Sequence, residues 1–359
     1  MRKEKIAVRV GSVVIGGNAP ISVQAMTKTD TRDFKATFSQ IRSLVKEGAE
    51  IIRVAVPDEE SCRVLRHLKR EVEVPLVADV HFDPNLGFKA LEAGADKIRV
   101  NPGNIGGQDA LLELAREARR RGAAIRIGVN SGSVERDILA RYGRPCAEAM
   151  VESALKHVRF LEDHGVDGIV ISLKSSSAWE TVRAYRLIHE KTSWPLHVGV
   201  TEAGPGLSGV VKSAAGIGAL LAEGIGDTVR VSLSAPPEEE VRVARDILQS
   251  LELRTFGPDV IACPTCARCQ VQDLPDVAIR VKKALENIKE PLKVAVMGCP
   301  VNGPGEAREA DVGLACGRDG GILFRRGQAQ GRVKREEMVE ALLALCREEI
   351  EARRRGDAR

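Results

Sequence analysis

The amino-acid sequence predicts a (β/α)8 TIM barrel followed by a small α+β domain. Over about the first 250 residues, amphipathic helical segments repeatedly end at a glycine, and a short β-branched run follows. Eight such runs alternating with helices match the strand number and chain length of a TIM barrel, with a doubly wound open sheet as the alternative. From about residue 258 the order of elements changes. We therefore expect a barrel domain over residues 1–255 and a second domain over residues 256–359.

The barrel elements can be assigned in order along the chain. Residues 8–15 alternate about a glycine and are expected to form a hairpin that closes the bottom of the barrel. Glycines that end helical segments mark most joints before strands, at Gly48, Gly94, Gly122, Gly165 and Gly224. The expected strands cover residues 21–24, 51–54, 75–78, 97–100, 125–128, 168–171, 196–198 and 227–230.

The second domain is expected to mix helices and strands around cysteine-bearing loops. After a first cysteine loop, the pattern predicts a helix over residues 277–288 and a strand over residues 292–297. A Gly/Pro-rich loop, a strand near residues 321–325 and a last helix from residue 336 follow. This order defines an α+β domain with the cysteine loops at its edge.

Composition and charge exclude several classes of function. The 359 residues are 43% hydrophobic and carry a net charge of +4, as in a soluble globular protein. Only 3% are aromatic, so few side chains could stack on nucleic-acid bases, and we expect no nucleic-acid partner. No apolar stretch is long enough for a signal peptide or a membrane span. We expect no membrane contact and a cytoplasmic location, where reduced cysteines serve as ligands more often than as disulfides.

Polar side chains occupy strand positions where a barrel interior is normally apolar. Alternate residues of each strand face the interior or, at the last turn, the mouth where active sites lie. The polar residues that share such faces are Arg53, Arg99 with Asn101, Arg126 with Asn130, Arg230 with Ser232, Asp79 with His81, and Ser172 with Lys174. Burying unpaired cations costs several kcal/mol each, so they require an anion. A diphosphate fits the paired donors of arginine best, whereas pairing with Asp79 or Glu202 in a structural network is the alternative.

Four of the eight cysteines gather in two loops, which indicates a metal site. These are Cys263, Cys266 and Cys269 in the first loop and Cys299 in the second. Their spacing is more typical of an iron–sulfur cluster than of a structural zinc. Glu306 in the second loop suggests a cluster with one exchangeable, substrate-facing iron, which leaves the fourth ligand open between Cys269 and Glu306. The other cysteines, at positions 62, 146, 316 and 346, are expected to be packed thiols.

Several segments resemble the bacterial 4-hydroxy-3-methylbut-2-enyl diphosphate synthases of the methylerythritol phosphate route to isoprenoids. The resemblance rests first on Cys263-Pro264-Thr265-Cys266 and on Met297-Gly298-Cys299-Pro300-Val301-Asn302-Gly303-Pro304-Gly305-Glu306-Ala307. In the barrel it rests on Ser22-Val23-Gln24-Ala25-Met26-Thr27, Asp79-Val80-His81-Phe82, Ile98-Arg99-Val100-Asn101-Pro102-Gly103-Asn104, Arg126-Ile127-Gly128-Val129-Asn130-Ser131-Gly132-Ser133 and Gly199-Val200-Thr201-Glu202-Ala203-Gly204. It spans nearly the whole chain. The chain departs from the family pattern at Ala267 and at Ser177-Ala178.

The resemblance implies a ligand set and roles for the residues at the barrel mouth. It implies a [4Fe-4S] cluster on Cys263, Cys266, Cys299 and Glu306, so that Cys269 is excluded. It places substrate-binding residues at Arg53, Arg99, Arg126 and Lys174, with Asn130, Arg230, Ser232 and His81 nearby. The acid near the substrate falls on Glu202, the expected proton donor, and Glu306 is expected to leave its iron during catalysis.

The same resemblance implies a reaction and partners. The reaction is the reductive ring opening and dehydration of 2-C-methyl-D-erythritol 2,4-cyclodiphosphate to 4-hydroxy-3-methylbut-2-enyl diphosphate, with two electrons delivered through the cluster. A ferredoxin or flavodoxin is the expected donor. The last barrel helix returns to the bottom, opposite the mouth, so a head-to-tail homodimer is expected, each small domain capping the partner's barrel. The alternatives are a non-redox phosphate-substrate barrel enzyme with a structural zinc domain, or a non-catalytic metal-binding module.

Overall fold

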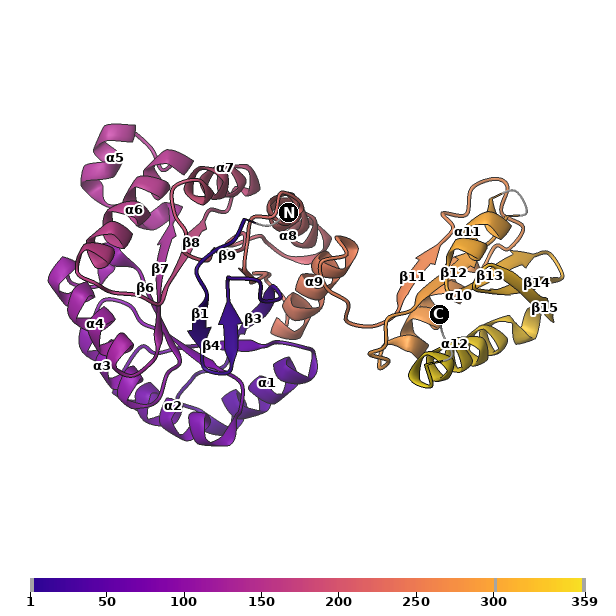
Figure 1. Cartoon of the computed structure of the whole chain (residues 1–359), viewed down its shortest axis with the longest axis horizontal. Coiled ribbons are helices and arrows are strands. Elements are labelled where there is room, and N and C mark those ends of the chain that lie inside the picture. Colours follow the sequence, from indigo (N-terminus) through magenta and orange to yellow (C-terminus); the bar gives the residue numbers. More distant parts are fainter. Residues whose placement is uncertain (1–2, 300–301, 357–359) are drawn as a thin grey trace. The chain divides into compact units, whose positions relative to one another are not determined.

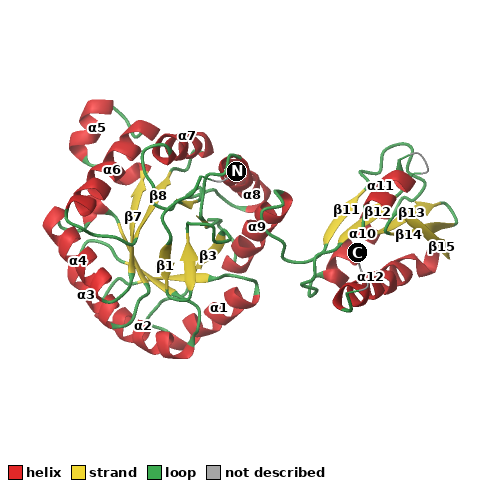
Figure 2. Cartoon of the chain, viewed as in Figure 1, coloured by secondary structure: helices red, strands yellow, loops and turns green. Residues whose placement is uncertain are grey.

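The chain forms two compact units, which the computed structural model describes over residues 3–299 and 302–356. The first unit covers residues 1–254 and the second covers residues 255–359. Figure 1 shows the eight-stranded barrel with its outer helices and the separate sheet of the second unit, and Figure 2 shows the same elements by type. The predicted TIM barrel and α+β domain are confirmed. None of the described helices is both long and apolar enough to cross a bilayer.

The first unit is a parallel barrel built from the eight predicted runs. Its strands are β3 (Ser22–Met26), β4 (Ile51–Ala55), β5 (Leu76–Asp79), β6 (Lys97–Val100), β7 (Ala124–Asn130), β8 (Ile169–Lys174), β9 (His197–Val198) and β10 (Thr228–Val229). Neighbours in sequence pair in parallel, and β10 pairs with β3. A parallel bridge between Ile171 and Leu196 joins β8 to the segment that enters β9. The doubly wound alternative is therefore wrong, because an open sheet would leave two edges unpaired.

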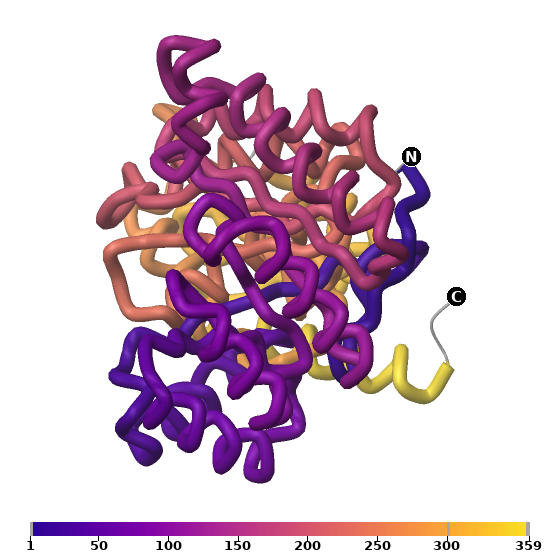
Figure 3. Tube along the Cα trace, turned by 90° about the vertical axis from the view of Figure 1, so that its left-hand side faces the viewer, coloured from indigo at the N-terminus to yellow at the C-terminus, as the bar shows by residue number. Residues whose placement is uncertain are grey.

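Helices surround the barrel and bury their apolar stripes against the strands (Figures 1 and 3). They are α1 (Phe34–Lys46), α2 (Glu59–Glu71), α3 (Pro84–Glu92), α4 (Gln108–Arg120), α5 (Arg136–Tyr142), α6 (Ala147–Asp163), α7 (Ala178–His189), α8 (Gly206–Ala222) and α9 (Pro237–Ser250), with 3-10 turns η1 (Pro102–Asn104) and η2 (Ser131–Ser133). Asp33, Asp58, Asp83 and Ser177 each accept a hydrogen bond from a backbone N–H of the first turn of the helix that follows. These caps fix where α1, α2, α3 and α7 begin after the mouth.

A hairpin of β1 (Val8–Val10) and β2 (Val13–Ile15) covers the bottom of the barrel, as predicted. Its turn uses Gly11 at φ +56°, where an added Cβ would lie 2.8 Å from the Asp96 carboxylate and 3.1 Å from Pro75. Asp96 and Pro75 directly precede β6 and β5. The hairpin therefore lies against the N-terminal ends of the strands, opposite the mouth.

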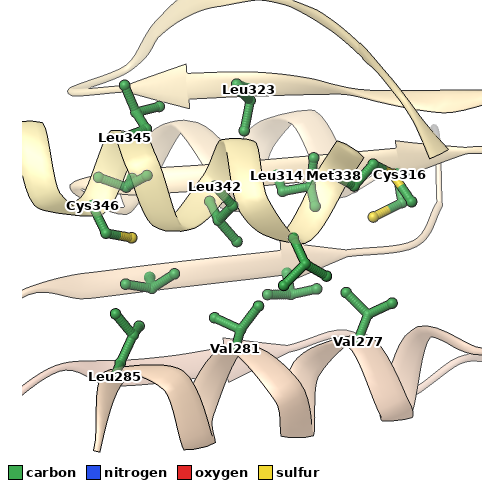
Figure 4. Close-up of a cluster of buried hydrophobic side chains, with 14 of the residues drawn as sticks. Val277, Val281, Leu285, Leu314, Cys316, Leu323, Met338, Leu342, Leu345 and Cys346 are labelled. Carbon is green, nitrogen blue, oxygen red and sulfur yellow. The ribbon is translucent and has the colours of Figure 1, made fainter. Parts of the chain in front are cut away.

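The second unit is a five-stranded mixed sheet with helices on both faces. Its elements are β11 (Asp259–Ala262), α10 (Leu274–Leu285), β12 (Lys293–Met297), α11 (Gly303–Glu309), β13 (Val312–Gly317), β14 (Gly320–Arg325), β15 (Gln328–Lys334), η3 (Arg335–Glu337) and α12 (Met338–Arg354). The spatial order follows the sequence, with β11 to β13 parallel and β13 to β15 antiparallel. One face packs on α10 and α12 through residues that include Val281, Leu314 and Leu342 (Figure 4).

The other face of this sheet packs on α11, which the sequence interpretation had placed in a Gly/Pro-rich loop. That prediction is wrong over residues 303–309, because Pro304 lies in the first turn of a helix, where a missing N–H leaves no bond unmade. Ala307 is buried from α11 against Ala295 and Ala315 of the sheet. Three strands, β11, β13 and β15, were not predicted at all.

Candidate functional site

The mouth of the barrel holds a buried carboxylate surrounded by basic groups. Asp79, at the end of β5, accepts a hydrogen bond from Arg99 Nη1 at 3.2 Å, and its other oxygen lies 3.9 Å from Arg53 Nε. His81 Nε2 lies 3.4 Å from Asp79 and 2.9 Å from Arg99 Nη1. Burial alone would raise the pKa of Asp79, but Arg53, His81 and Arg99 hold it far below its ordinary value. Asp79 is therefore an ionised anchor that orients three predicted substrate-binding residues.

Arg126 and Lys174 are buried without an acidic partner. Arg126 on β7 is 1% exposed, and its Nε and Nη1 make no hydrogen bond. Burial and the neighbouring Arg53 and Arg99 lower its pKa. Lys174 at the end of β8 has its Nζ 3.3 Å from His197 Nε2, an imidazole that carries no negative charge, and burial followed by Arg230 lowers the pKa of Lys174. Among the described residues, neither side chain has a negative charge beside it that would offset the free-energy cost of its burial. A bound anion would therefore stabilise both.

Arg230 completes the ring of basic groups from the eighth strand position. Its Nη1 donates to Ser232 Oγ, and its Nη2 lies 3.3 Å from Glu240 Oε2. Glu240 also accepts the Leu233 backbone N–H at 2.8 Å and lies 3.0 Å from Lys28 Nζ. Burial lowers the pKa of Arg230 to about 10 despite this carboxylate. The structural-network alternative thus holds for Asp79 and Glu240 as partners but leaves Arg126 and Lys174 uncompensated.

Two glycines give the cations the room that they occupy. An added Cβ at Gly128 would lie 2.9 Å from Arg99 Nε and 3.1 Å from Ser172 Oγ. An added Cβ at Gly199 would lie 2.9 Å from Lys174 Nζ and 2.3 Å from a backbone oxygen. Each of these contacts is too close for a side chain. The two glycines therefore allow the basic groups to lie close to the backbone.

The remaining predicted mouth residues are less closely tied to this ring. Asn130 ends β7, is half-buried and pairs in register with Lys174 on β8. Glu202 follows β9 in an exposed bend at φ +50°, and the backbone N–H of the next residue donates to Ser232 O at 3.3 Å. This places Glu202 at the mouth end of the barrel without a hydrogen bond or ion pair to the basic residues in the part of the chain described.

Sequence reasoning missed three polar residues of the interior: Lys97, His197 and Glu240. Lys97 is fully buried on β6 and its Nζ makes no hydrogen bond. It lies two residues before Arg99, so strand alternation could have placed both on the interior face. His197 is also fully buried, and burial followed by Arg126 and Lys174 lowers its pKa. Glu240 lies on a helix, where no strand alternation would have marked it.

In the second unit, Arg268 is bonded to one of the predicted ligands. Cys266 accepts hydrogen bonds from the backbone and side chain of Arg268, which lower the pKa of its thiol. The side-chain bond to Cys266, followed by the charges of Cys266, Cys299 and Cys263, raises the pKa of Arg268. The first loop is tied to the second because Gln270 N–H donates to Gly298 O at 2.9 Å. The two cysteine loops are therefore neighbours, with Arg268 beside Cys266.

Cys269 has contacts of its own in the first loop. Its Sγ donates to Val271 O at 3.2 Å, and an added Cβ at Gly298 would lie 2.5 Å from that sulfur and 2.6 Å from Leu274. The side chain packs against the core under α10. Its thiol is thus engaged by a carbonyl oxygen and apolar neighbours.

The predicted metal ligands are mostly thiols. Thiolate side chains are donors to iron–sulfur clusters and to zinc alike. Among the described residues, no three His, Cys, Asp or Glu side chains form a group that could hold one metal ion. Glu306 is exposed on the first turn of α11, and Pro300 and Val301 of its motif lie outside the described residues.

The fold and the site together define a TIM-barrel protein with a cationic mouth, joined to a smaller domain whose cysteines suit an iron–sulfur cluster. Residues 5–245 match the family model described as GcpE TIM-barrel domain, and residues 259–348 match that of the GcpE protein C-terminal domain. The chain belongs to the GcpE family. The family resemblance drawn from the motifs is thereby confirmed.

Curated relatives cover nearly the same length. The chain is 53% identical over 344 residues to a protein of Geobacter sulfurreducens, covering 96% of this chain and 97% of that one. It is 54% identical over 333 residues to a protein of Nitratidesulfovibrio vulgaris, covering 93% and 86%. Both are named 4-hydroxy-3-methylbut-2-en-1-yl diphosphate synthase (flavodoxin). Among solved structures, Yersinia pestis dihydropteroate synthase in a sulfonamide drug complex matches with a TM-score of 0.50 and 11% identity, covering 69% of this chain and all of that one, which shows the barrel fold alone.

Proposed function

We propose that this chain converts 2-C-methyl-D-erythritol 2,4-cyclodiphosphate into 4-hydroxy-3-methylbut-2-enyl diphosphate, the product named for its curated relatives. Two electrons and two protons enter, the C–O bond of the ring breaks, and one hydroxyl leaves as water. The observation that carries the proposal is the set of buried basic groups at the barrel mouth that lack acidic partners. A substrate with two phosphoryl groups supplies the missing negative charge.

The basic residues bind and orient the diphosphate. Arg126 and Lys174 supply donors from β7 and β8, and Asp79 holds Arg99 and His81 in place beside them. Asn130 lines the same mouth from the end of β7, and Arg53, Arg230 and Ser232 line it from β4 and the segment after β10. As the C–O bond to the phosphate breaks, these fixed charges stabilise the negative charge that develops, without reorganisation.

Three cysteines, Cys263, Cys266 and Cys299, together with Glu306, would hold a [4Fe-4S] cluster. When bound, the cluster supplies the two electrons, one at a time. Its electrons come from a flavodoxin or ferredoxin, and the protein works in the cytoplasm. Glu306 would be the exchangeable ligand, because its carboxylate is exposed and no described contact holds it, and Glu202 at the mouth is the proton donor.

We further propose a head-to-tail homodimer in which each small domain covers the partner's barrel mouth. Arg254, the last residue of the first unit, donates to Ile21 O at 2.9 Å, just before β3, so the chain leaves the barrel at its bottom. At the mouth end, Trp179, Leu207 and Val211 begin α7 and α8 and are 64%, 78% and 57% exposed. Large apolar side chains so exposed on a barrel rim are suited to burial by a partner.

Three variants test the function. In anaerobically purified protein, Arg126→Met is expected to weaken binding of the cyclodiphosphate by about 100-fold or more, because a charge-assisted bidentate contact is lost, while iron and sulfide content stay unchanged. Cys299→Ser is expected to lose the cluster and keep diphosphate binding. Glu202→Gln is expected to bind substrate normally and turn over slowly.

Three results would contradict these assignments. A colourless protein with stoichiometric zinc and no acid-labile sulfide would replace the reductase by a non-redox enzyme. Unchanged affinity in Arg126→Met would move the substrate elsewhere. Full turnover in Glu202→Gln would remove its role as proton donor.

A further inference from the structure

One face of the second unit's sheet is only partly covered by helix. Residues on the other face pack beneath α10 and α12, whereas α11 covers this face around Ala295, Met297, Ala315 and Phe324. Beside α11 a cavity of about 470 Å³ remains, with Ala315 and Ile322 on its floor and Cys299 and Pro304 at its end. An open apolar floor thus reaches one of the proposed cluster ligands.

The edge strand β15 places positive charge along this hollow. Arg332 pairs in register with Ile322, and Lys334 pairs with Gly320, so both side chains lie on the same sheet face as the floor. Both line the cavity and are exposed, and neither forms an ion pair within the described residues. Asp319 is the acidic residue in the lining.

A second hollow carries further basic side chains beside the first cysteine loop. It measures about 640 Å³, shares Gln270 with the first, and is lined by Arg268, Arg318 and Arg335. Arg318 is exposed in the turn between β13 and β14, and Arg335 lies 2.7 Å from Asp273. Cys299 lines the first hollow and Cys269 lines the second, so each cysteine loop borders a hollow with exposed basic side chains. We call Arg318, Arg332 and Lys334 the basic rim.

We propose that the basic rim is the docking surface for an acidic electron-donor protein. The proposal rests on the proposed function, since it assumes that a cluster at Cys263, Cys266, Cys299 and Glu306 receives electrons. In each encounter the donor loses one electron and the cluster gains it, so two encounters supply one turnover. The donor belongs to the class of low-potential flavin or iron–sulfur proteins, consistent with the word flavodoxin in the relatives' names.

The geometry of the rim favours a protein over a small anion. At the barrel mouth the cations are buried and converge, as a small diphosphate requires, whereas the rim cations are exposed and spread over an edge strand and a turn. Dispersed surface charge contributes little to tight binding but raises association rates by about 10- to 1,000-fold, as transient electron-transfer complexes need. Their interfaces are small, with less than about 1,200 Å² buried.

The test compares two variants with the same charge change. Arg332→Glu with Lys334→Glu reverses the rim, and Arg280→Glu with Lys283→Glu reverses two exposed positions of α10, the helix on the opposite sheet face. Binding of a bacterial flavodoxin is measured by calorimetry at low and high salt, and reduction is followed by stopped flow with reduced flavodoxin or with dithionite. The rim variant is expected to bind and accept electrons from flavodoxin about tenfold more weakly at low salt, with the difference vanishing at about 0.5 M salt. The α10 variant is expected to match wild type.

The outcomes separate this proposal from the proposed function. Equal losses in both double variants, or unchanged flavodoxin binding in the rim variant, would overturn the docking surface. Loss of dithionite-driven turnover in the rim variant would assign the face to substrate contact instead. If the protein holds no cluster, the proposed function fails, and the calorimetric comparison still decides whether the rim binds the donor. Arg318→Glu, in a surface turn, repeats the test without altering β15.

Discussion

At the scale of single residues, Lys97 is a buried basic group of the barrel interior. Its amine makes no hydrogen bond within the described residues, and burial followed by Arg126 and Arg53 lowers its pKa well below the ordinary value. Burial followed by Arg126 and Lys174 also lowers the pKa of His197 in the same interior. Burying the Lys97 amine therefore costs free energy that no hydrogen bond among the described residues offsets.

Replacing Lys97 with methionine is expected to stabilise the ligand-free protein. Because the folded pKa is lowered, the unfolded chain binds more protons, so wild-type stability rises with pH until the ordinary value near 10.5 is reached. Lys97→Met removes this slope and adds about 2 kcal/mol near neutral pH, where burying the amine costs most. Urea unfolding at about pH 7 and pH 9 measures both effects. A destabilised variant with an unchanged pH slope would mean that Lys97 has a charged partner.

The sequence predicted the buried basic residues of the candidate site better than it predicted their partners. Strand alternation marked Arg53, Arg99, Arg126, Lys174 and Arg230, because charge on a barrel face is unusual and local in sequence. The partners Glu240 and His197 could not be found this way, since their roles depend on packing between elements distant in the chain.

At the scale of elements, close backbone approach matters as much as the charges. Gly128 on β7 gives space to the guanidinium of Arg99, which Asp79 and His81 hold from β5 and the segment after it. A side chain at residue 128 would displace the Arg99 guanidinium from this position, while the barrel itself would stay closed. Glycine within a strand is therefore part of the substrate site here.

Gly128→Ala is expected to weaken diphosphate binding about tenfold with a smaller loss of stability. The added methyl lies 2.9 Å from Arg99 Nε, so the guanidinium must shift by a few tenths of an ångström or more. Gly132→Ala is the control, because nothing lies within 4 Å of its added Cβ. Calorimetric titration with the cyclodiphosphate gives the affinities, and equal effects of both changes would contradict the steric argument.

The prediction of helices and strands succeeded where glycines ended the elements at regular intervals, and it failed where glycine and proline had more than one structural role. Glycines before β-branched runs defined the barrel strands, since helix ends and buried strands alternate there. Gly303, Pro304 and Gly305 looked like breakers yet begin α11, because Pro is tolerated in a first turn. β15 was missed because its exposed, polar sequence lacks the alternation of a half-buried strand.

At the scale of the whole molecule, the proposed active site needs groups from both units. The proposed diphosphate-binding cations lie in residues 1–254, and the cysteines of the two loops lie in residues 255–359. The proposed head-to-tail homodimer would join them between two copies. Its apolar contact would bury the exposed rim residues of α7 and α8.

Mixing two inactive variants tests the dimer. Arg99→Met removes a substrate contact and Cys299→Ser removes a cluster ligand, so a heterodimer with the head-to-tail arrangement contains one intact barrel opposite one intact cluster. Mixed chains are expected to regain about a quarter of wild-type activity, because half of the dimers are mixed and each has one complete site. Leu207→Asp is expected to favour the monomer in sedimentation. No recovered activity on mixing would place the whole site within one chain.

The hairpin at the base of the barrel has a kinetic consequence. With β1 and β2 lying across the N-terminal ends of the strands, traffic of ligand to the buried cations is directed through the opposite end. Product would then leave through the same end of the barrel by which substrate enters. With the proposed homodimer, both steps would require the partner's small domain to move off the mouth, and such motions set the rate of turnover in many enzymes.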